Sequence, residues 1–536
     1  MSKFIWNIII ITILVYYVQV LYDIWVRPVV LTKKGWIRGI QSPDGKFNMF
    51  LGIPYAIVRE DNPFGLSIPY PRFNDTFDAS DDTKICPQVE EVLQRPVGTL
   101  QCLSLHVYVP KNPNKLPVLL FLYGGEYRMG HAGSIGQLQI NKPDYLIKHD
   151  IIVVEFNYRV GVYGFLCLDR PDIPGNQGLK DQSLALRWVK DNIAEFGGDP
   201  EKITVSGHSS GAMSVDFHVY ANPELFQQVI LQSGTALIPR SVEVNTIIPF
   251  EVAKRLGYET SDLNEALDFI KNTNVLSVAE VSKNITFRPC IEKRFKGVEA
   301  FIKEHPINMI PNVRNKNLMI GNAIDEFVSK TYLQDSLLDR DELFKVNLEF
   351  DFDITDKKII DEVIRFYIGD NVVSKKFRKE SLDFYNDVNF HYPTHYVIDK
   401  YLENKANKIF YYIFNYTGDM NLMKIMKNVT DDTAVHADEL GYLYKFSFLN
   451  KKVNRNDQMM MNRMTTMWAN FVKFGDPTVE KSELLPVKWL PTSKNNKQCL
   501  VIDSEFKMDN TVLQDRLAFW YNFHKKYERF HRYKVT

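Results

Sequence analysis

Cysteine is scarce in this chain. Its 536 residues include five cysteines, none in a CxxC pair or beside histidines at metal-ligand spacing. Structural zinc sites are built from such clusters of thiolate and imidazole ligands. The sequence therefore predicts no metal site, and no other motif in it indicates a cofactor.

An excess of either charge is also missing. The 65 Lys and Arg residues balance the 65 Asp and Glu residues, whereas nucleic-acid binding normally leaves a basic patch. Internal repeats and low-complexity segments are absent as well. Hydrophobic residues make up 45% of the chain, which is ample for a large core and argues against disorder. The composition predicts an ordered globular protein without a nucleic-acid partner.

An apolar run lies within residues 1–23. It reads FIWNIIIITILVYYVQVLY and is typical of a signal peptide or an uncleaved signal anchor. No Ala, Gly or Ser between Phe4 and Arg27 offers a good cleavage site, so both interpretations stay open, with a buried core helix as a third. In the first two, residues 24–536 enter the secretory pathway and are secreted or stay anchored to a membrane.

Two further features agree with a secretory route. Four sites fit the N-glycosylation pattern, each weak by itself: Asn74, Asn284, Asn415 and Asn428. Cys86 and Cys102 stand close together, so a disulfide between them is plausible, although two buried thiols explain the spacing equally well. The remaining cysteines lie in apolar surroundings and are expected to be core residues: Cys167, Cys290 and Cys499. The closing residues HRYKVT carry no retention signal or lipid-anchor tail, so membrane contact is expected only through the N-terminal segment.

Short apolar runs alternate with helical patterns along the chain. We expect strands at PVLLFLYGG, IIVVEFNYR, ITVSG, QVILQSG, NLMIGN and KIFYYIFNY, and an amphipathic helix at DQSLALRWVKDNIAEFGG. This alternation predicts a mostly parallel α/β sheet flanked by helices. The segment 245–317 has a more variable texture, as an insertion or lid over one core would have. Because no convincing linker follows, we expect a single large catalytic domain at 24–536.

The sequence Gly207-His208-Ser209-Ser210-Gly211 directly follows the expected strand ITVS and precedes a helix-compatible run. This is the G-x-S-x-G nucleophile elbow in its strand–turn–helix context. Glycines are needed there because the turn is tight, and the turn pushes the Ser209 hydroxyl out of the sheet. The following helix N-terminus offers N–H groups to developing negative charge. The pattern predicts that Ser209 is a nucleophile.

A serine nucleophile needs a base and an orienting acid, here expected in the chain order Ser, Asp/Glu, His. Asp325 and Glu326 follow the expected strand at NLMIGN, and His436 precedes an apolar helix start. On spacing alone other histidines compete with His436: His305, His391 and His395. Many carboxylates likewise compete with Glu326, so spacing leaves both assignments open.

The ordered motifs resemble those of the carboxylesterase/cholinesterase family, the type-B carboxylesterases, most like the insect carboxylesterases. The resemblance spans nearly everything after Arg27 and rests on these blocks: MFLGIPYA, CLSLHVYVP, NYRVGVYGFL, PGNQGLKDQSLALRWVKDNIAEFGGDP, ITVSGHSSGAMS and MWANFVKFGDPT. It implies an α/β-hydrolase fold and hydrolysis of carboxylic esters through an acyl-serine, with a small-molecule ester as partner and no cofactor.

By this resemblance Glu326 matches the acid of the G-x-N-x-D-E pattern, and His436 matches the base of the H-x-D-E block. Cys86 and Cys102 match the family's disulfide pair. Arg159 and Asp181 match a buried ion pair, whose role we expect to be structural. The N–H groups expected to hold the oxyanion belong to Gly125, Glu126 and Ser210.

Glu126 departs from the family, which typically has a third glycine at this position. Its side chain leaves the N–H donor in place but strains the loop if the position requires a positive φ. Either the carboxylate points away and an ordinary esterase results, or it reshapes the site. In the second case it slows ordinary esters or activates water against a covalent adduct such as a phosphoryl-serine.

Two rival functions remain. A cholinesterase-like adhesion or binding protein keeps this fold but has lost catalysis, and such proteins typically lack triad members and carry a C-terminal membrane span. Here Ser209, Glu326 and His436 are all present. A lipase acting at an interface is the second rival, which a comparison of micellar and soluble substrates would separate.

Overall fold

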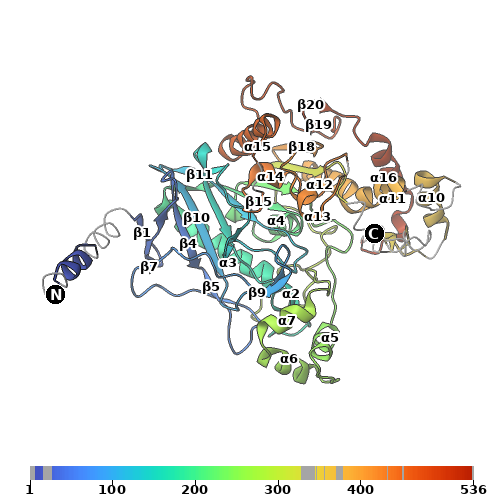
Figure 1. Cartoon of the computed structure of the whole chain (residues 1–536). Helices are drawn as coiled ribbons and strands as arrows, with labels where there is room; N and C mark the ends of the chain where they lie inside the picture. The colour runs from blue at the N-terminus through green and yellow to red at the C-terminus, as the bar shows by residue number, and fades with distance from the viewer. Residues whose placement is uncertain are drawn as a thin grey trace.

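A mixed sheet of eleven strands forms the centre of the described chain (Figure 1). The computed structural model describes residues 6–15, 27–327, 344–345, 347–349, 351–354, 357–369, 378–430, 432–449 and 452–533. The spatial order of the strands is β20-β19-β18-β17-β16-β15-β11-β14-β10-β4-β3. The repeated crossovers in this order, with helices packed on the sheet, are those of a doubly covered α/β protein.

Seven adjacent strands of this sheet run parallel. They are β11 (Leu116–Leu122), β14 (Ile152–Phe156), β15 (Gly198–His208), β16 (Gln228–Gln232), β17 (Asn317–Ala323), β18 (Lys408–Phe414) and β19 (Cys499–Ile502). Their runs are mostly apolar and buried, and in β14 all five residues are buried, including the charged Glu155. Parallel strands read this way because helices cover both faces of the sheet.

Antiparallel strands complete both edges of the sheet. One edge carries β10 (Ser104–Pro110), β4 (Phe47–Pro54) and β3 (Ile40–Gln41), and the other carries β20 (Lys507–Asp509). A separate three-stranded sheet consists of β1 (Val29–Thr32), β2 (Gly35–Arg38) and β7 (Phe77–Asp78). Short ribbons are formed by β5 (Ala56–Ile57) with β6 (Ile68–Pro69), β8 (Gln88–Glu90) with β9 (Arg95–Val97), and β12 (Ser134–Ile135) with β13 (Leu138–Gln139).

Helices follow most of the parallel strands. Those around the sheet are α2 (Gly161–Phe165), α3 (Gln177–Asn192), α4 (Ser210–Ala221), α12 (Tyr392–Glu403), α13 (Leu422–Lys427), α14 (Leu440–Leu443) and α15 (Arg455–Phe474). A second hydrophobic cluster, centred on Trp520, gathers α10 (Lys357–Ile368), α11 (Arg378–Asn386) and α16 (Gln514–Lys526). In Figure 1 these three helices lie together at one end of the molecule.

The expected elements agree with the structure in kind and place. Each of the six expected strands is present, and the five apolar positions of the expected helix are buried: Ala185, Trp188, Val189, Ile193 and Phe196. The helix begins earlier than expected, at Gln177, and turns into a 3-10 helix before Gly197 caps it in the left-handed region. Boundaries differ because caps and tertiary packing, rather than periodicity, decide where a helix ends.

The segment 245–317 forms three helices, α5 (Ile248–Arg255), α6 (Leu263–Asn272) and α7 (Val275–Ser282). They lie beside one another below α2 in Figure 1, away from the sheet. At the other extreme of the chain, residues 6–15 form an exposed helix that projects from the body. In the described part of the chain no helix is both long and apolar enough to cross a membrane.

Two disulfides cross-link the chain. One joins Cys86 to Cys102, and the other joins Cys167 to Cys290 across 123 residues. Cys167 and Cys290 are buried core residues, as their apolar surroundings predict. The disulfide between them was not predicted, because the fold joins two sequence segments that no spacing rule connects. Cys499 is a free buried thiol. Two disulfides suggest an extracytoplasmic compartment.

Candidate active site

Ser209 stands at the turn between β15 and α4, as the elbow pattern predicts. Its backbone has φ 56° and ψ −127°, outside the favoured regions for a residue with a side chain. The Ser209 N–H donates to the carbonyl oxygen of Gln232 on β16, at 2.9 Å. The neighbouring strand therefore helps to hold a strained backbone, which is typical of functional positions.

Glycines surround this turn because no side chain fits there. A Cβ atom at Gly207 would lie 2.4 Å from the backbone of Gly211, and one at Gly211 would lie 2.2 Å from the Leu122 carbonyl oxygen. A Cβ at Gly234 would lie 2.3 Å from the carbonyl oxygen of Ser209 itself. The first two are the glycines of the motif. Gly234 is a third requirement that the motif alone does not reveal.

Glu326 and His436 come together although 110 residues separate them. Glu326 Oε2 lies 2.5 Å from His436 Nδ1, and the other carboxylate oxygen accepts the Ala323 N–H at 2.9 Å. Burial alone would lower the pKa of His436, but the hydrogen bond and negative charge of Glu326 outweigh it and raise that pKa. The competing histidines are elsewhere: His391 and His395 are buried, with their pKa lowered to about 3, and His305 stacks on Tyr533.

The Glu326 loop is held by a side chain that the sequence did not single out. Asn386, at the end of α11, accepts the N–H groups of Glu326 and Phe327 at 3.1 and 3.0 Å. Its amide nitrogen donates to Asp325, which in turn accepts the Thr433 hydroxyl. Asp325, the other carboxylate of the pair after β17, thus anchors the loop while Glu326 faces His436.

A second histidine and carboxylate lie beside His436. The His208 ring packs against the His436 ring at 4.6 Å between centroids, and its Nε2 lies 3.9 Å from Glu439. Burial lowers the pKa of His208 well below 6.5, so it is neutral at pH 7. Burial, together with the charge of Glu326, raises the pKa of Glu439 to about 7. These neighbours place a weakly charged environment around the imidazole of His436.

The loop after β11 approaches Ser209 from the opposite side. A Cβ at Gly124 would lie 2.8 Å from the Ser209 Cβ, so the two backbones are in close contact. Gly125, Glu126 and Tyr127 all have positive φ, of 123°, 58° and 60°. Within the described chain the N–H groups of Gly125 and Glu126 have no hydrogen-bond acceptor. The Ser210 N–H belongs to the first turn of α4, whose donors a helix leaves free.

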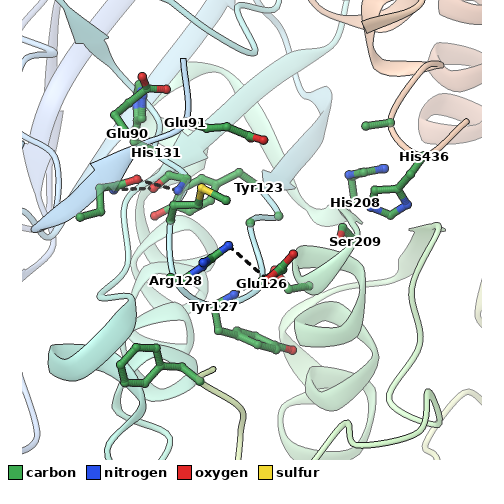
Figure 2. Close-up of a pocket in the computed structure, with 18 of the residues that line it drawn as sticks. Glu90, Glu91, Tyr123, Glu126, Tyr127, Arg128, His131, His208, Ser209 and His436 are labelled. Carbon is green, nitrogen blue, oxygen red and sulfur yellow. Dashed lines mark hydrogen bonds and ion pairs between the residues drawn. The ribbon is translucent and has the colours of Figure 1, made fainter. Parts of the chain in front are cut away.

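Glu126 is strained and charged. Two successive non-glycine residues in the left-handed region cost about 1–2 kcal/mol each. The Glu126 carboxylate lies 3.3 Å from the Arg128 guanidinium and is half exposed (53%). Its charge nevertheless contributes to raising the pKa of His436, so it acts within the same site. Figure 2 shows Glu126 and Arg128 on the side of the cavity facing Ser209.

One cavity of about 810 Å³ joins these features. Ser209, Glu326, His436, Gly125, Glu126 and Ser210 all line it. Segments from the α5–α7 region also contribute, including Asn284 and Phe287. The volume suits a small organic molecule. The buried Arg159–Asp181 pair, at 2.7 Å, lies outside the cavity lining and ties two core segments together, as expected of a structural ion pair.

The four glycosylation sequons differ in surroundings. Asn74, Asn284 and Asn428 are exposed, whereas Asn415 is half-buried and donates to Asp503 at 2.8 Å. Asn284 stands at the cavity lining itself.

Residues 26–520 match the model of the carboxylesterase family, and the chain belongs to this family. It is 29% identical to esterase FE4 of Myzus persicae over 485 residues, covering 84% of both chains. It is 30% identical to esterase B1 of Culex pipiens, covering 84% of this chain and 88% of that one. Juvenile hormone esterase of Heliothis virescens is 28% identical over 84% of this chain and 86% of its own.

The solved structures give the fold. Juvenile hormone esterase from Manduca sexta, with OTFP covalently attached, superimposes with a TM-score of 0.79 at 24% identity. The match covers 93% of this chain and all of that one. The fold is therefore the α/β-hydrolase fold, as the sequence motifs predict.

Proposed function

We propose that this protein is a serine carboxyl ester hydrolase that works through an acyl-enzyme on Ser209. The observation that carries this proposal is the Glu326–His436 hydrogen bond at 2.5 Å, lining the same cavity as a strained serine elbow. A hydroxyl, a carboxylate and an imidazole, in this chain order and arrangement, are the groups that acyl transfer requires. Family membership supports an ester as the substrate.

In this proposal His436 takes the proton of Ser209 as the hydroxyl attacks the ester carbonyl. Glu326 holds the imidazole tautomer through Nδ1 and stabilises the imidazolium that forms. His436 then protonates the leaving alcohol, and water repeats the sequence on the acyl-enzyme to release a carboxylic acid. The N–H groups of Gly125, Glu126 and Ser210 stabilise the oxyanion, each worth about 100-fold or more in turnover.

The test is hydrolysis of p-nitrophenyl acetate and butyrate, with titration by a fluorophosphonate probe. We expect turnover and labelling, both lost in Ser209→Ala. Ser214→Ala is a matched control, because it removes a hydroxyl from the same helix α4 outside the cavity lining, and we expect it to retain both.

Other outcomes would contradict the proposal or narrow it. Labelling without turnover would show that Ser209 is reactive but that the oxyanion loop at Glu126 impairs catalysis. Folded protein with neither activity would instead favour the binding or adhesion protein that shares this fold. A strong preference for micellar over soluble esters would indicate a lipase. Faster loss of a phosphoryl adduct than in Glu126→Gly would favour the water-activating role of Glu126.

We further propose that residues 24–536 form one catalytic domain and that residues 1–23 direct it to the secretory pathway. The two disulfides and the exposed sequon residues Asn74, Asn284 and Asn428 support this route. Glycosidase treatment of protein recovered from a secreting host tests it. A mobility shift and a mature N-terminus beyond residue 23 are expected for a cleaved signal, whereas an intact N-terminus on membranes would indicate an anchor.

A further inference from the structure

Basic side chains gather on one wall of the cavity. This wall, here called the basic wall, consists of Arg128, Arg240, Lys283 and Arg288, all of which line the cavity. Arg128 follows the oxyanion loop, and the other three come from the chain around α5–α7. Ser209 and His436 line the same cavity, and in Figure 2 they lie to the right of Arg128. A substrate in the cavity therefore faces both the reacting groups and this wall.

Three of the four cations already have a carboxylate partner. Arg128 pairs with Glu126 at 3.3 Å, Arg240 with Glu243 at 3.5 Å, and Lys283 with Glu280 at 2.5 Å. Among the described residues, no carboxylate lies within 4 Å of the Arg288 guanidinium. Its Nη1 donates to the Phe287 carbonyl oxygen at 2.8 Å. Among the residues that the structure describes, Arg288 is thus the member of the basic wall whose charge has no direct counter-ion.

Burial makes this unpaired charge unfavourable. Arg288 is half-buried, and burial lowers the pKa of its guanidinium despite the opposing effect of the Glu126 charge. A cation held partly out of water gains more from an added anion than an exposed one, because the local dielectric is lower. The site is therefore favourable for a ligand that brings its own negative charge.

The backbone that carries Arg288 is fixed. Two residues further on, Cys290 is bound to Cys167, and its N–H and carbonyl both hydrogen-bond to the Asn176 side chain at 2.8 Å. Glu292 accepts from the same side chain and from Lys180. Because this backbone segment is already held in place, Arg288 loses less conformational freedom when it binds a ligand, which favours binding.

We propose that Arg288 forms an anion subsite, and that the cavity takes carboxylic esters that carry a free carboxylate as a second group. The inference rests on the proposed function for its reaction and on the unpaired cation for its selectivity. The charge of Glu126 acts on Arg288, so the subsite lies close to the oxyanion loop. A carboxylate suits it because a guanidinium binds that planar anion through two parallel hydrogen bonds.

The experiment compares two substrates of equal acyl length, mono-4-nitrophenyl glutarate and 4-nitrophenyl pentanoate. The rate with Ser209→Ala is subtracted, since the glutarate ester also hydrolyses by itself. In Arg288→Met we expect kcat/KM for the anionic ester to fall tenfold to hundredfold, mainly through KM, with less than a twofold change for the neutral ester. Arg288→Lys is expected to restore part of the loss.

Lys283→Met is the matched control, because it removes a cation of the same wall that Glu280 already neutralises. We expect it to leave the ratio between the two substrates unchanged. Retained turnover of the neutral ester shows that each variant is folded. An equal loss on both substrates in Arg288→Met, or no loss on either, would overturn the anion subsite.

A binding measurement separates this inference from the proposed function. Calorimetry of monoethyl glutarate with Ser209→Ala is expected to show binding that Arg288→Met weakens at least tenfold. If the wild-type protein hydrolyses neither ester but this difference in binding appears, the hydrolase proposal fails and the subsite stands. If both esters are hydrolysed through Ser209 without a difference in binding, the subsite fails and the hydrolase proposal stands.

Discussion

The two sides of the cavity are built on different principles. On the catalytic side, Glu326 is fixed by the Ala323 N–H and by Asn386, and every hydrogen bond converges on one orientation of His436. On the other side, the oxyanion loop keeps a strained backbone at Glu126, and the basic wall keeps an unneutralised charge at Arg288. In our proposals the first arrangement serves the reaction, whereas the second provides binding energy for a particular substrate. We therefore expect chemistry and selectivity to be separable by substitution.

The largest effect is expected on the catalytic side. Glu326→Gln removes the charge and the tautomer control behind His436, and we expect kcat to fall about 10⁴-fold. In the proposed mechanism neutral His436 is the base, and its pKa is raised above 6.5, so we expect wild-type activity to be lost as the pH falls through a midpoint above 6.5. In the variant that midpoint moves to lower pH.

The pH–rate profile of kcat/KM from pH 5 to 9 measures this shift. Glu201→Gln is the control, since this carboxylate is exposed and pairs only with Lys190. A wild-type midpoint at or below 6.5 would contradict the assignment of Glu326 as the partner that raises the His436 pKa.

The second effect concerns stability. Cys167–Cys290 closes a loop of 123 residues and Cys86–Cys102 one of 16, so chain entropy assigns them about 5 and about 3 kcal/mol. Replacing both cysteines of the longer link by serine is expected to lower the urea midpoint more than the same change in the shorter link. It is also expected to reduce the preference for an anionic ester, because Cys290 anchors the Arg288 segment. Equal midpoints for the two variants would contradict the loop-length argument.

A smaller gain is expected at the oxyanion loop. Glu126→Gly removes a carboxylate and relieves a residue at φ 58°, so we expect neutral ester turnover to rise about tenfold, equivalent to about 1.4 kcal/mol. Glu126→Gln keeps the backbone strain and removes only the charge. Comparison of the two kcat values therefore separates the contribution of the charge from that of the strain. Unchanged kinetics with esters and organophosphates in Glu126→Gly would show that this side chain does not influence the site.

The smallest effect is expected at His208. Because burial keeps this ring neutral, His208→Gln changes no charge beside His436. We expect less than a threefold change in kcat and a shift of less than about half a unit in the acid limb, which the same pH profile measures. A larger shift would mean that His208 carries a proton in the reaction and exchanges it with Glu439.

The fold and the reacting groups could be predicted from the sequence because they depend on local patterns and ordered motifs. The elbow needs Gly207 and Gly211 next to Ser209, and the sheet needs apolar runs, both of which are visible in the chain. Spacing left His305, His391 and His395 as competitors of His436, and the resemblance to a family decided between them.

The remaining features depend on contacts between distant segments. Asn386 reaches Glu326 across 60 residues, and Cys290 reaches Cys167 across 123. No periodicity connects such positions, so this disulfide was not predicted. The unpaired charge of Arg288 also arises only in three dimensions, because pairing depends on which carboxylates the fold brings near. Three further cysteines in a chain that we expect to be secreted were the signal that could have suggested a second bridge, since disulfides persist in oxidising compartments.

The Cys167–Cys290 link has a practical consequence for anyone producing the protein. Gly175 packs so closely that an added Cβ would lie 2.4 Å from the Cys290 sulfur, so the chain beside the disulfide has no room for a side chain at this position. In a reducing bacterial cytoplasm the chain would retain five thiols, whereas the oxidised protein has one, Cys499. A thiol count under denaturing conditions therefore distinguishes oxidised preparations, with one thiol, from reduced ones, with five. The substrate preference should be measured on the oxidised preparation.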